Sequence, residues 1–265
     1  MLKKYQLGIL GVGKMGSAIL NGVIAKGFYK TEEVAIYTLE DETKAKYHAL
    51  GVNLVKDEIE LFQNCQTLIL AIKPQIYESV LEKITDLDFT NQVIISIAPG
   101  KTIAYLSKYF PHAQIIRAMP NTPALIGEAT ITVAFNERTK NVEQALQIFE
   151  AIGDYYILEE EQIDDAIPLN GSMPAYVLKF VESFISCGIK YGLDPDVSKA
   201  LALKAIIGSC RLALNSQQDI STLIQNVCSK GGTTIKGLDE LNRGPFDEAI
   251  ANCYKECVKR SKELR

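Results

Sequence analysis

A glycine-rich loop close to the start of the chain constrains the fold more than any other segment. Gly11-Val12-Gly13-Lys14-Met15-Gly16 follows the apolar run from Gln6 to Leu10, which we predict to be a strand, and it opens a predicted helix near Met15. Glycines at such a position allow a tight turn and let backbone amides approach a pyrophosphate at the positive end of the helix. The loop therefore predicts a dinucleotide-binding βα unit. The alternative is a tight turn with a purely structural role.

Short apolar runs alternate with helix-like stretches up to about Gly153. The runs that we predict to be strands are Gln6 to Leu10, Val34 to Thr38, Thr67 to Ile72, Val93 to Ile97, Ile115 to Arg117 and Thr130 to Phe135. This alternation is typical of parallel βα units. The stretch from Leu68 to Ile72 is apolar at every position, which indicates a strand covered on both faces. We therefore expect an α/β fold with a doubly wound Rossmann sheet.

The pattern changes after the acidic cluster Glu159-Glu160-Glu161. Apolar residues then recur at helical spacing, beginning with Val177, Phe180, Val181 and Phe184. We predict a Rossmann domain over residues 1–158 and an all-helical dimerisation and substrate-binding domain over residues 159–265. Small residues between Ala200 and Ala213 would let helices pack closely, either in a subunit interface or within one domain.

Composition excludes several classes of function. The 265 residues carry a formal charge of −4 with scattered lysines and arginines, so we expect no nucleic-acid partner. No apolar run reaches the roughly 20 residues of a membrane span, and no cleavage signal is recognisable, so we expect a cytoplasmic protein. The two histidines and six cysteines show no ligand-like spacing, so we expect no metal site.

The choice of dinucleotide is ambiguous in the sequence. An NAD enzyme is expected to place an acid near the end of the second strand, about 20 residues past the loop. Here Thr38 ends that strand and would accommodate a 2′-phosphate, whereas Glu40 and Asp41 would repel one. Lys44 and Lys46 are either phosphate partners or part of a solvated helix face. NADPH and NADH both stay open, with NADPH slightly favoured.

Ligands of open α/β sheets bind beyond the carboxyl ends of the strands. Ala71-Ile72-Lys73-Pro74 ends one predicted strand, and Ala98-Pro99 follows the next with small residues that suit a flat nicotinamide. Lys73 either faces the cofactor or lies in solvent. Arg117 to Pro123 forms a rigid loop in which Asn121 either contacts a ligand or satisfies local backbone groups.

A second glycine-rich loop lies in the helical half of the chain. Gly231-Gly232-Thr233-Thr234 opens a predicted amphipathic helix, which suggests a second anion site. The alternative is a flexible Gly-Gly joint with Thr233 as the helix cap. Two such loops suggest one cofactor and one small anionic substrate.

Five segments taken together resemble the pyrroline-5-carboxylate reductases over essentially the whole chain. They are Gly11 to Gly16, Ala71 to Pro74, Arg117 to Pro123, Gly171 to Tyr176 and Ser229 to Leu241. The resemblance implies a Rossmann domain followed by a helical dimerisation domain, with a homodimer or a ring of dimers. It also implies reduction of 1-pyrroline-5-carboxylate to L-proline with NAD(P)H, the last step of proline biosynthesis.

The resemblance also implies roles for single residues. Thr234 would be catalytic, its hydroxyl bonded to the ring nitrogen of the substrate, with the amides of the second loop around the substrate carboxylate. The expected substrate-binding residues are Gly231, Gly232, Thr233, Thr234 and Asn121. The expected cofactor-binding residues are Gly11, Val12, Gly13, Lys14, Met15, Gly16, Thr38, Ala71, Ile72, Lys73, Pro74, Ala98, Pro99 and Asn226.

The chain departs from the family pattern at several positions. Met173 and Lys230 stand where family members usually have glycine and proline, and Ile167 stands where they usually have threonine. Glu58 lies where an asparagine often contacts the cofactor. These departures keep two alternatives open, which are a reductase of a related cyclic imine or hydroxy acid and a weakly active, dinucleotide-binding regulatory paralogue.

Overall fold

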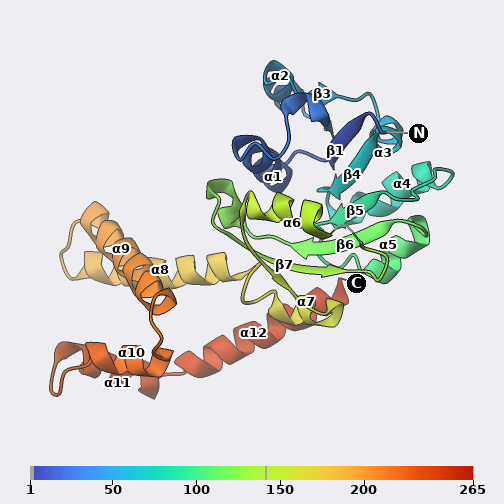
Figure 1. The fold of residues 1–265 in the computed structure, drawn as a ribbon. Coiled ribbons are helices and arrows are strands. Elements are labelled where there is room, and N and C mark those ends of the chain that lie inside the picture. The colour runs from blue at the N-terminus through green and yellow to red at the C-terminus, as the bar shows by residue number, and fades with distance from the viewer. Residues whose placement is uncertain (1–2, 141, 265) are drawn as a thin grey trace. The chain divides into compact units, whose positions relative to one another are not determined.

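The computed structural model describes residues 3–140 and 142–264, and contacts within the chain group these residues into two compact units (Figure 1). The α/β unit holds the residues up to Pro174 together with those from Cys257 onward, and the helical unit is Ala175–Glu256. The domain limit that we predicted between residues 158 and 159 stays a prediction. Residues 159–174 contact mainly the α/β unit and belong to it.

The α/β unit is built on one eight-stranded sheet in the order β3-β2-β1-β4-β5-β6-β7-β8. The first six positions reproduce the strand order of a Rossmann fold, so the predicted doubly wound sheet is confirmed. The strands are β1 Tyr5–Leu10, β2 Val34–Tyr37, β3 Asn53–Leu54, β4 Cys65–Leu70, β5 Val93–Ser96, β6 Gln114–Met119, β7 Ala129–Phe135 and β8 Gly153–Ile157.

The expectation of parallel strands throughout is wrong at β7, which runs antiparallel to β6. The two strands are joined by residues 120–128, which is shorter than the dozen or so residues that a parallel crossover needs. The connection contains a short 3₁₀ helix, η4 (Thr122–Ile126), and closes at Gly127 with a φ of 74°. The sequence pattern also missed β3, which has two residues, and β8, which is mostly exposed.

Helices cover both faces of the sheet (Figure 1). Leu7 and Ile9 of β1 pack in a core with α1 and α6, while Leu10 packs on the opposite face with α3, α4 and α5. The helices of this unit are α1 Lys14–Ala25, α2 Asp41–Ala49, α3 Glu58–Asn64, α4 Tyr77–Leu81, α5 Ile103–Tyr109, α6 Val142–Glu150 and α7 Glu160–Ala166, with the 3₁₀ turns η1 Thr31–Glu33, η2 Pro74–Ile76 and η3 Glu82–Ile84.

The helical unit contains α9 (Pro195–Leu214), α10 (Ile220–Val227) and α11 (Thr233–Arg243), with most of α8 (Met173–Lys190) and α12 (Phe246–Glu263). It buries almost nothing within one chain. Between Ala175 and Glu256 the buried side chains are Val181 and Ser198, whereas Leu214 is 85% exposed. Exposed apolar surface of this extent is typical of a surface that contacts another molecule. No helix among the described residues is long and apolar enough to cross a membrane.

Candidate functional site

The loop after β1 has the geometry of a dinucleotide cradle. Gly11 has a φ of 87°, and its amide donates to the carbonyl of Tyr37 at 2.9 Å. A Cβ on Gly11 would lie 2.8 Å from Cγ2 of Ile72, so position and conformation both require glycine. A Cβ on Gly16 would collide with the carbonyl oxygen of Gly11, which shows how closely α1 packs on the turn.

Gly13 has the opposite environment. It is exposed, it caps the start of α1 without a side-chain hydrogen bond, and a Cβ placed on it would meet nothing within 4 Å. The first turn of α1 holds no acidic residue, and the first amides of a helix have no partner within it. Open space, free amides and a positive helix end fit the pyrophosphate of a dinucleotide.

The predicted cofactor residues of the α/β unit share one edge of the sheet. Strands β2, β1, β4 and β5 are parallel neighbours, so their carboxyl ends meet at that edge. Thr38 follows β2, Ala71 follows β4, and Ala98 and Pro99 follow β5. Ala71 donates its amide to the carbonyl of Leu10 at 2.9 Å, which brings this segment beside Gly11. Lys73 is exposed and caps η2, with Pro74 in its first turn.

A buried tyrosine, Tyr77, joins the ends of β4 and β5 by hydrogen bonds. We did not predict this contact from the sequence. The Tyr77 hydroxyl donates to the carbonyl of Leu70 at 3.0 Å and lies 2.9 Å from Oγ of Ser96. The Ser96 hydroxyl accepts from the amide of Ala98 at 3.4 Å. Burial raises the pKa of Tyr77 well above its ordinary value, so this phenol stays protonated. In the sequence, this contact was indicated only by a serine, Ser96, at the end of the apolar run from Val93 to Ile95.

The side chain of Asn121 is engaged within the protein. It is buried, its Nδ2 donates to the carbonyl of Asn170 at 3.1 Å, and its Oδ1 accepts from the amide of Thr130 at 3.0 Å. Asn170 in turn donates to the carbonyl of Met119 at 2.8 Å. These bonds favour the structural alternative for Asn121, and its contact with the substrate stays a prediction.

The second glycine-rich loop opens α11 in the helical unit. Gly231 has a φ of 75°, and Gly232 caps the helix and donates its amide to the carbonyl of Ser229 at 3.0 Å. The suggested cap at Thr233 is wrong, because Thr233 is the first residue of the helix and Thr234 the second. Both threonines are exposed, and the first turn of α11 holds no acidic residue. The loop therefore presents helix amides and two hydroxyls, as an anion site requires.

Asn226, a predicted cofactor residue, and Glu58, a departure from the family pattern, both have side-chain partners within the protein. Asn226 lies on α10, where its Nδ2 donates to Oε1 of Gln218 at 2.9 Å. Its contact with the cofactor stays a prediction. Glu58 begins α3 and accepts from Nζ of Lys83 at 3.0 Å, so its carboxylate already has a cationic partner.

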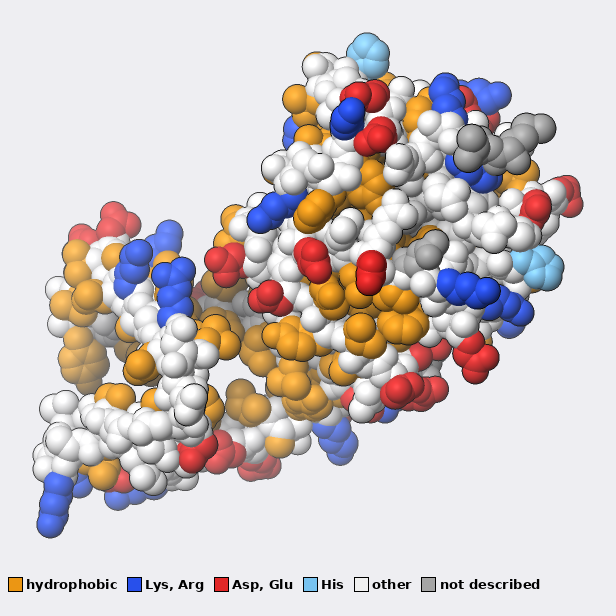
Figure 2. Space-filling model, in the orientation of Figure 1, with side chains coloured by type: hydrophobic (Ala, Val, Ile, Leu, Met, Phe, Trp, Pro, Cys, Tyr) orange, Lys and Arg blue, Asp and Glu red, His pale blue; other side chains and the backbone are white. Residues whose placement is uncertain are grey.

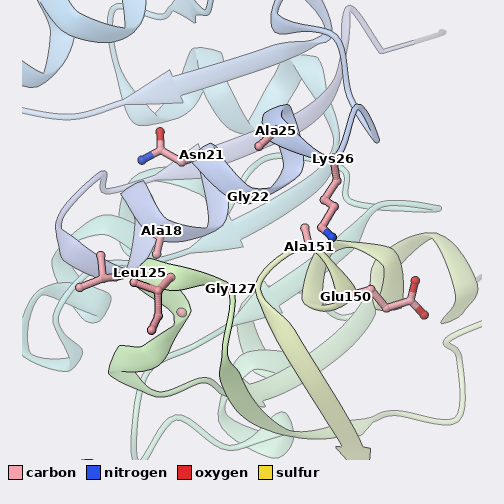
Figure 3. Close-up of a pocket in the computed structure, with 11 residues that line it drawn as sticks. Ala18, Asn21, Gly22, Ala25, Lys26, Leu125, Gly127, Glu150 and Ala151 are labelled. Carbon is pink, nitrogen blue, oxygen red and sulfur yellow. The ribbon is translucent and has the colours of Figure 1, made fainter. Parts of the chain in front are cut away.

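A separate hollow of about 400 Å³ lies between α1, η4 and the end of α6 (Figure 3). Asn21, Lys26, Leu125 and Glu150 are among its lining residues. None of the residues predicted to bind cofactor or substrate lines it.

Among the described residues no group of His, Cys, Asp or Glu is arranged to hold a metal ion.

Both glycine-rich loops lie in regions of the chain that match known protein families. A family model described as pyrroline-5-carboxylate reductase dimerisation matches residues 160–264, and one described as NADP oxidoreductase, coenzyme F420-dependent, matches residues 6–100. The pyrroline-5-carboxylate reductase of Escherichia coli is 32% identical over 263 residues, covering 98% of this chain and 98% of the relative. Pyrroline-5-carboxylate reductase 2 of Bacillus subtilis is 34% identical over 268 residues, covering 98% and 95%.

The chain belongs to the pyrroline-5-carboxylate reductase family. A crystal structure of the Plasmodium falciparum pyrroline carboxylate reductase with NADP bound superposes with a TM-score of 0.89 at 30% identity, covering 100% of this chain and 99% of the other. Each matched model covers one of the two glycine-rich loops. The oxidoreductase model spans Gly11 to Gly16 and the strand ends, whereas the dimerisation model spans Asn226 and the loop from Gly231 to Thr234.

Proposed function

We propose that this protein reduces 1-pyrroline-5-carboxylate to L-proline with NAD(P)H, the last step of proline biosynthesis. One observation carries the proposal. A chain that matches pyrroline-5-carboxylate reductases from end to end presents two glycine-rich, helix-opening loops, and each has free amides and no acid in the first helical turn. One loop suits a pyrophosphate and the other suits a small carboxylate.

The first loop and the neighbouring strand ends would hold the dinucleotide. The amides from Gly13 to Gly16 would bind the pyrophosphate, and Ala98 and Pro99 would flank the nicotinamide. When bound, the reduced nicotinamide supplies the hydride. The hydroxyls of Tyr77 and Ser96 bond to the backbone of this edge at Leu70 and Ala98 and so stabilise the strand ends.

The second loop would hold the substrate. The amides of Thr233 and Thr234 lie at the positive end of α11, where they would bind the carboxylate, and the Thr234 hydroxyl would bond the ring nitrogen. A protonated imine is already electrophilic, so hydride transfer mainly requires proximity and orientation. A site with one hydroxyl and no histidine or metal is sufficient for that chemistry.

A homodimer completes the proposal, and we place the protein in the cytoplasm. The helical unit leaves most of its apolar residues uncovered in one chain, and the matched dimerisation model spans that unit. Figure 2 shows hydrophobic side chains at the surface of its helices. A second copy of the same unit would cover these faces and form the shared core that one copy lacks.

The direct test is an assay of purified full-length protein. The protein is mixed with the imine and either NADH or NADPH, and oxidation is followed at the nicotinamide absorbance, with proline identified by mass spectrometry. We expect oxidation that depends on the imine and yields proline in equal amount. A six-membered cyclic imine and a β-hydroxy acid serve as comparison substrates. Faster turnover of either, or no turnover of the pyrroline, would overturn the proposal.

A further inference from the structure

The loop between β2 and α2 lies where the adenosine ribose of a dinucleotide is expected. Leu10 pairs with Tyr37 in the parallel β1–β2 register, and the amide of Gly11 bonds the carbonyl of Tyr37. Thr38, the next residue, therefore lies beside the glycine-rich loop. In a Rossmann fold the residues at the end of the second strand contact the ribose 2′ position, where NADH has a hydroxyl and NADPH a phosphate.

Three acidic residues, Glu40, Asp41 and Glu42, follow Thr38 at the start of α2. Thr38 is 7% exposed, and its Oγ1 accepts from the amide of Glu40 at 3.4 Å. Glu40 caps the start of α2, and its carboxylate accepts from Oγ1 of Thr43 at 2.9 Å. Asp41 and Glu42 occupy the first turn of the same helix. The positive end of α2, which would attract a phosphate, thus carries three carboxylates, of which that of Asp41 is paired with Lys44.

The two lysines that the sequence offered as phosphate partners are engaged within α2. Nζ of Lys44 lies 2.8 Å from Oδ1 of Asp41, and Nζ of Lys46 lies 4.8 Å from the ring centroid of Tyr47. Lys14 is a further exposed cation, on the glycine-rich loop itself. It would favour the pyrophosphate that both cofactors share, so it does not discriminate between them.

We infer that the loop from Thr38 to Asp41 selects NADH over NADPH, with Glu40 and Asp41 rejecting the 2′-phosphate. This inference rests on the proposed function, and it differs from the slight preference for NADPH that we drew from the sequence. A 2′-phosphate carries a charge of about −2 near neutral pH and would meet like charges at this position. A ribose 2′-hydroxyl can instead donate a hydrogen bond to a carboxylate. The selection is therefore against one cofactor rather than for a tighter fit of the other.

Equilibrium binding tests the inference without any imine. Isothermal titration of the full-length protein with NADH and with NADPH at low salt gives the two dissociation constants. We expect NADH to bind at least tenfold more tightly, a difference of about 1.4 kcal/mol. The ratio should fall as salt rises, because exposed charges are screened over about 8–10 Å at physiological ionic strength. A ratio below tenfold at low salt, or tighter binding of NADPH, would overturn the inference.

Charge-removing variants assign the effect to its residues. In the double variant Glu40→Gln, Asp41→Asn, NADPH should bind at least fivefold more tightly. The affinity for NADH should fall by less than fivefold, because the amide oxygens can still accept from the ribose hydroxyl. Glu137→Gln, at an exposed turn residue after β7, is the matched control and should leave both affinities unchanged. An unchanged ratio in the double variant would show that these carboxylates do not select the cofactor. Tight, selective NADH binding without turnover of the imine would contradict the proposed function and leave this inference intact.

Discussion

Arg117 of β6 and Asp164 of α7 form an ion pair in which both side chains are completely buried, with 2.9 Å between Nη2 and Oδ1. Ser261, in the last turn of α12, donates a 2.7 Å hydrogen bond to the same carboxylate oxygen. Glu160 lies 3.5 Å from the guanidinium and also accepts from the amide of Ile103 at 2.7 Å. This cluster fastens the end of the chain to the sheet of the α/β unit.

Removal of the carboxylate from this cluster should strongly destabilise the α/β unit. Asp164→Ala leaves the buried Arg117 guanidinium with the partly exposed Glu160, at 3.5 Å, as its remaining carboxylate, and loss of one partner from a buried pair costs about 3–5 kcal/mol. Urea unfolding followed by circular dichroism should show a clearly lower midpoint. The double variant Arg117→Met, Asp164→Leu should recover part of the loss, because no buried charge remains. Asp41→Ala, which breaks an exposed pair, is the control and should unfold like the wild type. Equal midpoints for Asp164→Ala and the wild type would contradict the prediction.

Two glycines of the first loop should respond differently to the same substitution. Gly16→Ala forces a methyl group against the Gly11 carbonyl and should lower the melting temperature and abolish cofactor binding. Gly13→Ala adds a methyl group to open space, so the melting temperature should stay within about 1–2 °C while cofactor affinity falls at least tenfold. Thermal unfolding and isothermal titration with NADH measure the two effects. Normal cofactor affinity in Gly13→Ala would show that the pyrophosphate does not bind there.

Tyr77 should act as a positioning residue. Tyr77→Phe removes the hydroxyl that joins Leu70 to Ser96, which costs about 1 kcal/mol of stability and loosens the segment at Ala98. We expect kcat to fall at least fivefold while KM for the imine changes little, because the proposed carboxylate site lies at the start of α11 rather than on these strand ends. Tyr47→Phe is the matched control, since this buried tyrosine loses a single 3.1 Å bond to Asn21. Both variants should lose similar stability, and a similar loss of kcat in both would argue against positioning by Tyr77.

Features that depend on local backbone geometry were predictable from the sequence. The loop from Gly11 to Gly16 and the helix start after Gly232 follow from glycine conformation and helix-end chemistry, which act over a few residues. The alternative interpretation of the second loop placed the cap at Thr233, one residue too late, because the cap is Gly232. The six strand positions followed from their apolar runs, whereas the reversed direction of β7 depended on the length of a connection.

Features that depend on distant contacts were not predictable from one sequence. We expected Arg117 to begin a rigid loop, but it is a buried residue of β6, its partner is 47 residues away, and no periodicity relates the two. The same holds for Tyr77 and Ser96, which are 19 residues apart on different elements. The structural role of Asn121 depended on Asn170 and Thr130, which become its neighbours only in the folded chain. Polar side chains buried by tertiary packing therefore needed the structure.

Substitution of Thr234 tests the proposed catalytic hydroxyl most directly. Thr234 is exposed and is the second residue of α11, so Thr234→Ala should leave folding and cofactor affinity near those of the wild type. Loss of one hydrogen bond to the charged ring nitrogen removes about 1.5–3 kcal/mol of stabilisation, so kcat/KM should fall roughly 10- to 150-fold. Thr234→Ser keeps the hydroxyl and should retain most of the activity, while Thr233→Ala keeps the Thr234 hydroxyl and should have a smaller effect. Steady-state kinetics with the imine, together with NADH titration, separate these cases. Unchanged turnover in Thr234→Ala would remove this hydroxyl from the mechanism and leave the backbone amides of the loop as its only contribution.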